Sequence, residues 1–157
     1  MGKEVQLLQY SDAEQLLSFI EEVAKRRDDY YVNYQVDFAK LDDIYLHKLL
    51  FDYKILSFYE EDEDYAVIKL PELEEAENSI SLWILNVNDS KLLERVINKI
   101  KEDYSFYEWR FLKIIVLRKQ LTKGVKRFVE DYIKVQPIII KGNKEENDQF
   151  LYYVNLL

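Results

Sequence analysis

The spacing of apolar residues over the first 70 positions predicts a strand, two helices and a pair of strands. Residues 5–9 have the composition of a short strand. A one-sided apolar stripe then predicts a first helix, and its members are Ala13, Leu16, Leu17, Ile20, Val23 and Ala24. A looser stripe predicts a second helix, and its members are Phe38, Leu41, Tyr45 and Leu49. Residues 54–59 and 65–70 are strand-like, and the five acids at 60–64 between them predict a hairpin tip.

The second half of the sequence predicts strands that alternate with helices. A strand at 80–87 precedes an amphipathic helix that ends near position 103, and its apolar stripe is Leu92, Leu93, Val96, Ile97 and Ile100. Residues 111–117 form a nearly continuous apolar run, as expected for a strand that is covered on both faces. Residues 138–140 and 150–156 predict two last strands, after a further helix indicated by Val125, Phe128, Val129 and Tyr132.

This order predicts an α+β or α/β fold with a single mixed sheet of about seven strands, flanked by about four helices. The strands at 80–87 and 111–117 are expected to be central and parallel, because the helix between them can serve as a right-handed crossover. Trp83 is one residue out of phase with Leu82 and Ile84, so its side chain is expected to face the layer opposite to theirs.

Length and composition narrow the classes of protein. The chain has 157 residues, 48% of them hydrophobic, with three glycines and two prolines, which predicts one domain over 1–157 with a full core. Cysteine is absent and histidine occurs once, which excludes a disulfide framework, a thiolate nucleophile and a cysteine or histidine-rich metal site. The longest apolar runs are too short to span a membrane, and the N-terminus lacks a signal-peptide core, so a cytoplasmic location without membrane contact is expected.

Charge is distributed unevenly between the two halves. Residues 1–78 carry 8 Lys and Arg against 20 Asp and Glu, a net of −12, whereas residues 79–157 carry 14 against 10, a net of +4. The acidic total of −8 argues against nucleic-acid binding by the whole molecule, because the phosphate backbone attracts concentrated positive charge. This charge pattern is compatible with a local phosphate site in the second half or with a basic protein partner for the first half.

The element order and two sequence segments resemble the GNAT family of N-acyltransferases. Residues 5–13 resemble the family's first strand and helix start, and Gly124-x-x-x-Phe128-x-x-x-Tyr132 has the spacing of its last-helix signature. The resemblance implies acetyl-CoA as cofactor and an amine as acceptor. It also implies that the loop after the fourth strand, with the family pattern Gln/Arg-x-x-Gly-x-Gly/Ala, holds the cofactor's pyrophosphate at the start of the next helix.

The sequence departs from the family pattern at this loop. Positions 86–90 read Asn-Val-Asn-Asp-Ser and contain no glycine, which reduces the backbone freedom needed for close approach to a phosphate. Asn88 or Asp89 is a good N-cap whose side chain would occupy the same N–H groups, and Asp89 would repel an anion. We therefore expect no acetyl-CoA binding or only weak binding. The remaining candidates for cofactor contacts are Asn86, Asn88, Ser90, Lys91, Arg95 and Lys123.

The expected catalytic groups are also altered. The family often uses a tyrosine on the last helix as the general acid, and the matching position here is Phe128, which has no proton to give. Tyr132 is the candidate substitute. A carboxylate on or near the fourth strand commonly serves as base, but 80–87 contains none, which leaves Glu77 or Glu72 in the preceding loop.

Charged surface segments allow two interpretations each. The acids at 60–64 could bind a divalent cation, but they lack the spacing of a calcium loop, which favours a solvated hairpin end. A basic surface around the starts of the two C-terminal helices could approach phosphates or could be a solvated face. Its predicted members are Lys91, Arg95, Lys99, Arg118, Lys119, Lys123, Lys126 and Arg127.

Three functions are compatible with these patterns: a GNAT-like binding or regulatory module without activity, an acyl-CoA-dependent N-acetyltransferase, and an acidic interaction or inhibitor protein. A homodimer is also expected. The strand at 150–156 carries too many large apolar groups for one buried face, so it should leave an exposed edge or pack against a second copy.

Overall fold

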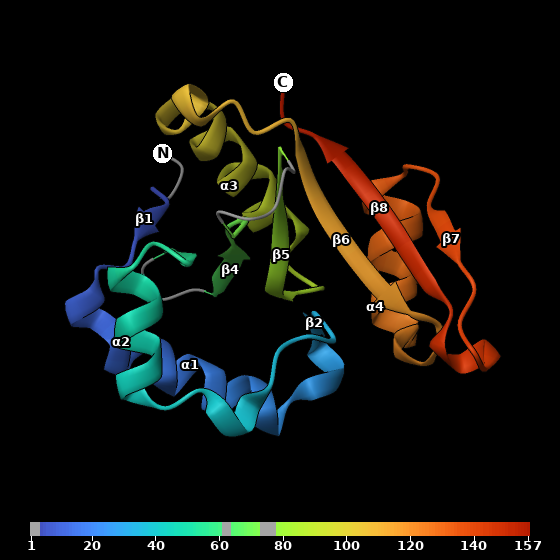
Figure 1. Cartoon of the computed structure of the whole chain (residues 1–157), viewed down its shortest axis with the longest axis horizontal. Helices are drawn as coiled ribbons and strands as arrows, with labels where there is room; N and C mark the ends of the chain where they lie inside the picture. The colour runs from blue at the N-terminus through green and yellow to red at the C-terminus, as the bar shows by residue number, and fades with distance from the viewer. Residues whose placement is uncertain (1–3, 61–63, 73–77) are drawn as a thin grey trace.

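The computed structural model describes residues 4–60, 64–72 and 78–157, and in this part of the chain a mixed β-sheet forms the centre of the molecule (Figure 1). The strand order is β1-β3-β4-β5-β6-β8-β7, with β2 paired to β5 off this path. The strands are β1 (Gln6–Leu7), β2 (Tyr30–Val32), β3 (Ile55–Tyr59), β4 (Tyr65–Lys69), β5 (Ser79–Asn86), β6 (Phe111–Leu117), β7 (Ile138–Ile140) and β8 (Gln149–Asn155). The predicted single mixed sheet is confirmed, with β2 as an additional strand.

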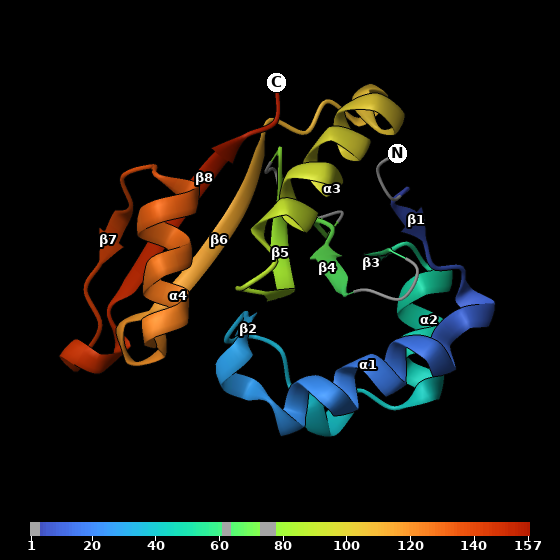
Figure 2. The ribbon, with the colours of Figure 1, turned by 180° about the vertical axis from the view of Figure 1, so that it is seen from behind.

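Helices cover both faces of this sheet (Figures 1 and 2). They are α1 (Ala13–Lys25), α2 (Asp43–Phe51), α3 (Ser90–Asp103) and α4 (Lys123–Arg127), and α4 continues as a π-helical segment over Phe128–Ile133. One core cluster joins the sheet to α3 and α4, and a second joins it to α1 and α2. Within the described residues no helix is long and apolar enough to cross a membrane.

The predicted crossover between the two central strands is confirmed. β5 and β6 are parallel neighbours, and α3 connects them. The α3 stripe is buried at Leu92, Leu93, Val96 and Ile100. The stripe of α1 differs from the prediction at two residues. Phe19 is buried although it was not predicted, and Ala24 is exposed although it was predicted. The large aromatic side chain faces the core because it removes more apolar surface from water.

A β-bulge interrupts the regular alternation of β5. Val67 of β4 lies opposite Ile84 while Ile68 lies opposite Leu82, so Trp83 is the extra residue. Trp83 therefore faces the α1–α2 side, opposite to Leu82 as predicted. The expectation that it also opposes Ile84 is wrong, because the bulge places Ile84 on the α1–α2 side as well.

The C-terminal strands do not have the predicted arrangement of edges. β8 lies inside the sheet between β6 and β7, and β7 forms the edge. Tyr152 and Leu156 are buried, whereas Tyr153 and Val154 are partly exposed. The apolar surface at this edge belongs instead to β7, where all three isoleucines are about half exposed.

Candidate functional site

The junction between β5 and α3 uses its own side chains to satisfy its backbone. The Oδ1 of Asp89 accepts from the N–H of Leu92 at 3.3 Å, which makes Asp89 the N-cap predicted from the sequence. Asn86 is buried, its Oδ1 accepts from the N–H of Asn88 at 2.8 Å, and its Nδ2 donates to Asp64 at 2.9 Å. Asn88 itself is exposed, and the side chain of Ser90 lies outside the described residues.

β5 and β6 are paired only near their first residues and then separate. They pair at only three positions, from Ser79 opposite Phe111 to Ser81 opposite Lys113, and then diverge (Figure 1). The bulge at Trp83 follows directly, and a bulge bends its strand and increases the local twist. The divergence is therefore encoded in β5 itself, and it leaves the edge of β5 from Ile84 to Asn86 without β6 as a partner.

β2 occupies the edge of β5 that this divergence exposes. Tyr30 pairs with Asn86, Tyr31 with Leu85 and Val32 with Ile84, all antiparallel. Backbone hydrogen bonds extend the pairing at both ends, from Asn33 N to Trp83 O at 2.8 Å and from Val87 N to Asp29 O at 3.0 Å. The N–H and C=O groups along this stretch of β5 are thus engaged by the chain itself.

Two side chains connect β2 across the gap to β6. The hydroxyl of Tyr31 donates to Ile115 O at 2.8 Å and accepts from Ile115 N at 3.2 Å, and Tyr31 is 2% exposed. Burial raises the pKa of Tyr31 well above its ordinary value, so the hydroxyl stays neutral. At the end of β6, Gln120 donates from Nε2 to Val32 O at 3.1 Å and accepts from Leu117 N at 2.9 Å. Tyr31 and Gln120 bridge the two diverging strands.

Arg95, a predicted phosphate contact, has an ionic partner within the protein. Its Nε donates to Oε1 of Glu60 at 2.9 Å, and its Nη2 contacts the same oxygen. Glu60 is 1% exposed, so the pair holds a buried carboxylate. The prediction of a solvated hairpin end is wrong at both described acids, because Asp64 accepts from Tyr30 and Asn86. Residues 61–63 lie outside the described part of the chain.

The other predicted cations are divided among different parts of the molecule. Lys91 and Lys123 are exposed at the starts of α3 and α4. The first turn of α4 packs close to the exit of β5, because a Cβ at Gly124 would lie 3.1 Å from Val87 Cγ2. Arg118 lies beside Asp148 and Phe150, where the turn of the β7–β8 hairpin enters β8, and Lys99 forms an ion pair with Asp103 at 2.9 Å.

The predicted catalytic residues lie in different surroundings. Tyr132 stacks on the buried Phe128 with ring centroids 6.0 Å apart and lies beside Glu94 of α3. Burial, together with the charge of Glu94, raises the pKa of Tyr132, so its hydroxyl gives up a proton less readily. Glu77 lies outside the described residues, and its role stays a prediction.

Glu72, the second carboxylate named from the sequence, is held by two lysines. Its oxygens lie 2.9 Å from Lys69 Nζ and 2.9 Å from Lys54 Nζ. Hydrogen bonds from Lys69 and Lys54 lower the pKa of Glu72 to about 2. A carboxylate with so low a pKa is a poor base for an ammonium group, so this arrangement favours a structural role.

Comparison with known proteins identifies the architecture. No family model matches the sequence, and no curated protein matches it. A probable acetyltransferase from Staphylococcus epidermidis is similar in structure, with a TM-score of 0.62 and 16% identity over 98% of this chain and 99% of that chain. A GNAT-family acetyltransferase from Streptococcus pneumoniae has a TM-score of 0.60 and 14% identity over 98% and 99%. The chain has the GNAT fold.

A third similar structure is that of the microcin C7 self-immunity acetyltransferase MccE, which was determined in complex with acetyl-CoA and AMP. It has a TM-score of 0.62 and 15% identity, over 97% of this chain and 92% of that chain. At these identities the likeness shows the fold and leaves activity open. Within the GNAT fold, β5 takes the place of the fourth strand of the predicted order, since β2 is additional.

The residues that shape this region of the GNAT fold most strongly were not predicted. These residues form hydrogen bonds to partners far away in the sequence. The separation is 84 residues for Tyr31, 88 for Gln120 and 35 for Glu60. The Tyr-Tyr-Val sequence of β2 does have strand propensity, which was the available signal, but three residues are too few for a periodicity.

Proposed function

We propose that this protein is a GNAT-fold binding or regulatory module that does not transfer acetyl groups. The observation that carries the proposal is β2, which lies along β5 at Ile84, Leu85 and Asn86 where β5 leaves β6. A chain segment that completes a sheet edge has to be displaced before another molecule can use the same backbone groups.

The location of β2 matters because of where a GNAT cofactor would have to extend. The resemblance places the pyrophosphate at the junction after β5 and the thiolate near the helix position that Phe128 occupies. The arm that joins these two ends would run between β5 and α4, over the diverging strands. Tyr31 fills this space and is hydrogen-bonded to β6 at both polar atoms of Ile115.

Three further features support the same proposal. Asp89 caps α3 and puts a negative charge where a phosphate would lie. The charge of Arg95 is compensated by Glu60. Phe128 is buried and carries no proton for a leaving thiolate.

The direct test is titration of the whole chain with acetyl-CoA by isothermal calorimetry. We expect a dissociation constant no tighter than about 1 mM, because the backbone contacts to the pyrophosphate contribute several kcal/mol where they exist. A micromolar constant would overturn the proposal. Coenzyme A is the comparison ligand. If it binds as weakly as acetyl-CoA, the affinity is lost in the nucleotide and arm that both ligands share and not at the acetyl group.

An acyl-CoA-dependent N-acetyltransferase is the second candidate, favoured by the fold likeness to proteins described as acetyltransferases over nearly the whole chain. In this function Tyr132 would be the general acid, Glu77 the base, and Asn88, Ser90, Lys91 and Lys123 the remaining cofactor contacts. Most of the rate enhancement would have to come from holding the amine of the substrate close to the thioester of acetyl-CoA. Release of free thiol from acetyl-CoA with a panel of amines tests it, and Tyr132→Phe should then abolish turnover.

We further propose a single domain over 1–157 in the cytoplasm that forms a homodimer through its C-terminal strands. The exposed isoleucines of β7 support the homodimer, because an unpaired apolar edge strand favours association. A basic protein partner for the acidic first half is a third possibility, the interaction or inhibitor function. A pull-down that weakens as ionic strength rises would support it.

A further inference from the structure

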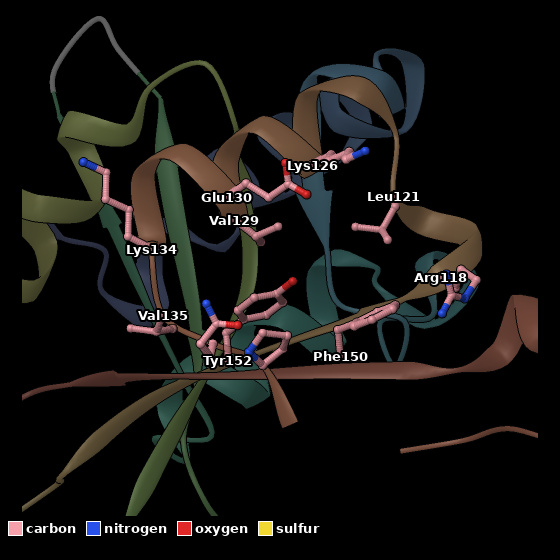
Figure 3. Close-up of a pocket in the computed structure, with 11 residues that line it drawn as sticks. Arg118, Leu121, Lys126, Val129, Glu130, Lys134, Val135, Phe150 and Tyr152 are labelled. Carbon is pink, nitrogen blue, oxygen red and sulfur yellow. The ribbon is translucent and has the colours of Figure 1, made fainter. Parts of the chain in front are cut away.

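A pocket of about 570 Å³ lies between α4, the segment that follows it and β8, and it is separate from the β5–α3 junction (Figure 3). Its volume is in the range of roughly 300–1,000 Å³ that is usual for small-molecule sites. Arg118 and Lys126 of the predicted basic surface line it, whereas the candidates named for cofactor contacts at the β5–α3 junction and for catalysis do not.

The inner surfaces of this pocket are apolar and partly aromatic. Phe150 and Tyr152 lie two residues apart on β8 and therefore face the same side of the sheet, toward α4. Val129, in the π-helical segment that continues α4, is buried and lies opposite them (Figure 3). A flat apolar group would fit between the helix and these two rings.

Arg118 stands at one end of the pocket with donors that the protein uses poorly. Its Nη2 lies 3.4 Å from Asp148 Oδ2 and its Nε lies 3.8 Å from Glu145 Oε1, both longer than a well-formed hydrogen bond. The Nε is buried and has no hydrogen-bond partner among the described residues. The guanidinium lies 5.1 Å above the ring of Phe150, which fixes it at the pocket wall.

Two opposite charges, one from α4 and one from the π-helical segment that continues it, line the same pocket. Lys126 and Glu130 are one helical turn apart, and neither forms an ion pair with a residue that the structure describes. Glu130 extends from the helix over the pocket, above Tyr152, and Lys126 lies beside it at the rim (Figure 3). Burial raises the pKa of Tyr152 and the charge of Glu130 raises it further, consistent with a carboxylate close to that hydroxyl.

We propose that this pocket binds a free aromatic α-amino acid. The carboxylate pairs with Arg118 and Lys126, the ammonium pairs with Glu130, and the ring packs between Val129 and Phe150. A purely apolar ligand would leave the charges of Lys126 and Glu130 and the Nε donor of Arg118 without a partner in the pocket, and a simple anion would meet Glu130 without a compensating donor. The inference is independent of whether the chain binds acetyl-CoA, since the two sites share no residue.

The test is a titration of the ¹⁵N-labelled full chain with L-phenylalanine, followed by NMR. We expect the largest shifts at the amides of Val129, Phe150 and Tyr152. Two half-ligands serve as comparisons, 3-phenylpropanoate without the ammonium and 2-phenylethylamine without the carboxylate. Each should bind about five- to tenfold more weakly, because each loses one charge-assisted hydrogen bond in a partly exposed site.

Variants on the exposed side of α4 sharpen the test without disturbing the core. Glu130→Gln should weaken L-phenylalanine about fivefold and should not weaken 3-phenylpropanoate, which has no ammonium to pair with Glu130. Lys126→Ala should weaken both of these ligands and spare 2-phenylethylamine. Asp131→Asn and Arg127→Ala are matched controls, exposed on the same helix outside the pocket, and should change nothing. The proposal is overturned if no amide shifts up to about 10 mM ligand or if the three ligands bind equally.

Discussion

At the scale of single residues, the hydroxyl of Tyr31 connects β2 to β6 where β5 and β6 have separated. Its hydroxyl bonds both the N–H and the C=O of Ile115, much as a neighbouring strand would. We expect Tyr31→Phe to lower the free energy of unfolding by about 2 kcal/mol, because the removed oxygen leaves both backbone groups of Ile115 buried and unpaired. Urea denaturation measures this change.

The matched control for Tyr31 is Tyr34→Phe, which alters a more exposed tyrosine and should shift stability by less than about 0.5 kcal/mol. Equal effects of the two substitutions would show that the Tyr31 hydroxyl does not hold β2 to β6.

Arg95 was predicted from the sequence to contact the cofactor, but in the structure it pairs with Glu60. Arg95→Met should cost about 2–3 kcal/mol, because it leaves the carboxylate of Glu60 buried without its cation. Adding Glu60→Gln should restore part of the loss, which a double-mutant cycle from denaturation curves measures. Lys91→Met, on the same helix and exposed, is the control with little effect. A strictly additive cycle would contradict this account of the pair.

At the scale of elements, the sequence predicted almost every strand and helix. β5, α3 and β6 follow from long periodic or continuous apolar patterns, which also predicted their parallel pairing. β2 could not be predicted, because its three residues form a strand only through the edge that the bulge at Trp83 exposes. The N-cap at Asp89 is local and was predictable, whereas the capture of Arg95 by Glu60 depends on tertiary structure.

The β3–β4 hairpin carries a pH-dependent contribution to stability through Glu72. Lys69 and Lys54 lower its pKa from 4.5 to about 2, so its contribution is complete above about pH 5 and is lost as the pH falls toward 2. Glu72→Gln should therefore lower the unfolding free energy at neutral pH. The expected loss is about 1 kcal/mol at most, because the side chain is 43% exposed and solvent screens the pairs.

The measurement for Glu72 is the difference in unfolding free energy between wild type and variant across this pH range. The difference should stay constant from about pH 8 to about pH 5 and shrink toward zero near pH 2. Glu146→Gln changes an exposed carboxylate for which no ion pair is found within the described residues, and it should show no such trend. A difference that persists unchanged at low pH would rule out the ion pairs as its source.

At the scale of the whole molecule, β7 is the edge through which we expect two copies to join. Ile138, Ile139 and Ile140 are 56%, 50% and 46% exposed, a contiguous apolar edge of a kind that monomeric proteins usually protect. An antiparallel pairing of β7 with β7 of a second copy, centred on Ile139, places Ile138 opposite Ile140 in both directions. The same three residues then serve both partners, as a two-fold symmetric interface requires.

Light scattering after size exclusion, over a dilution series, tests this arrangement. The wild-type chain of 19.0 kDa should show about twice that mass at high concentration and approach one chain on dilution. Ile139→Lys should give a single-chain mass throughout, because it places two lysines face to face at the symmetry axis. Ile44→Lys, on the exposed side of α2, is the matched control and should still dimerise. If the wild type has the mass of one chain at every concentration, the isoleucine edge of β7 is solvent-exposed in solution and the homodimer does not form.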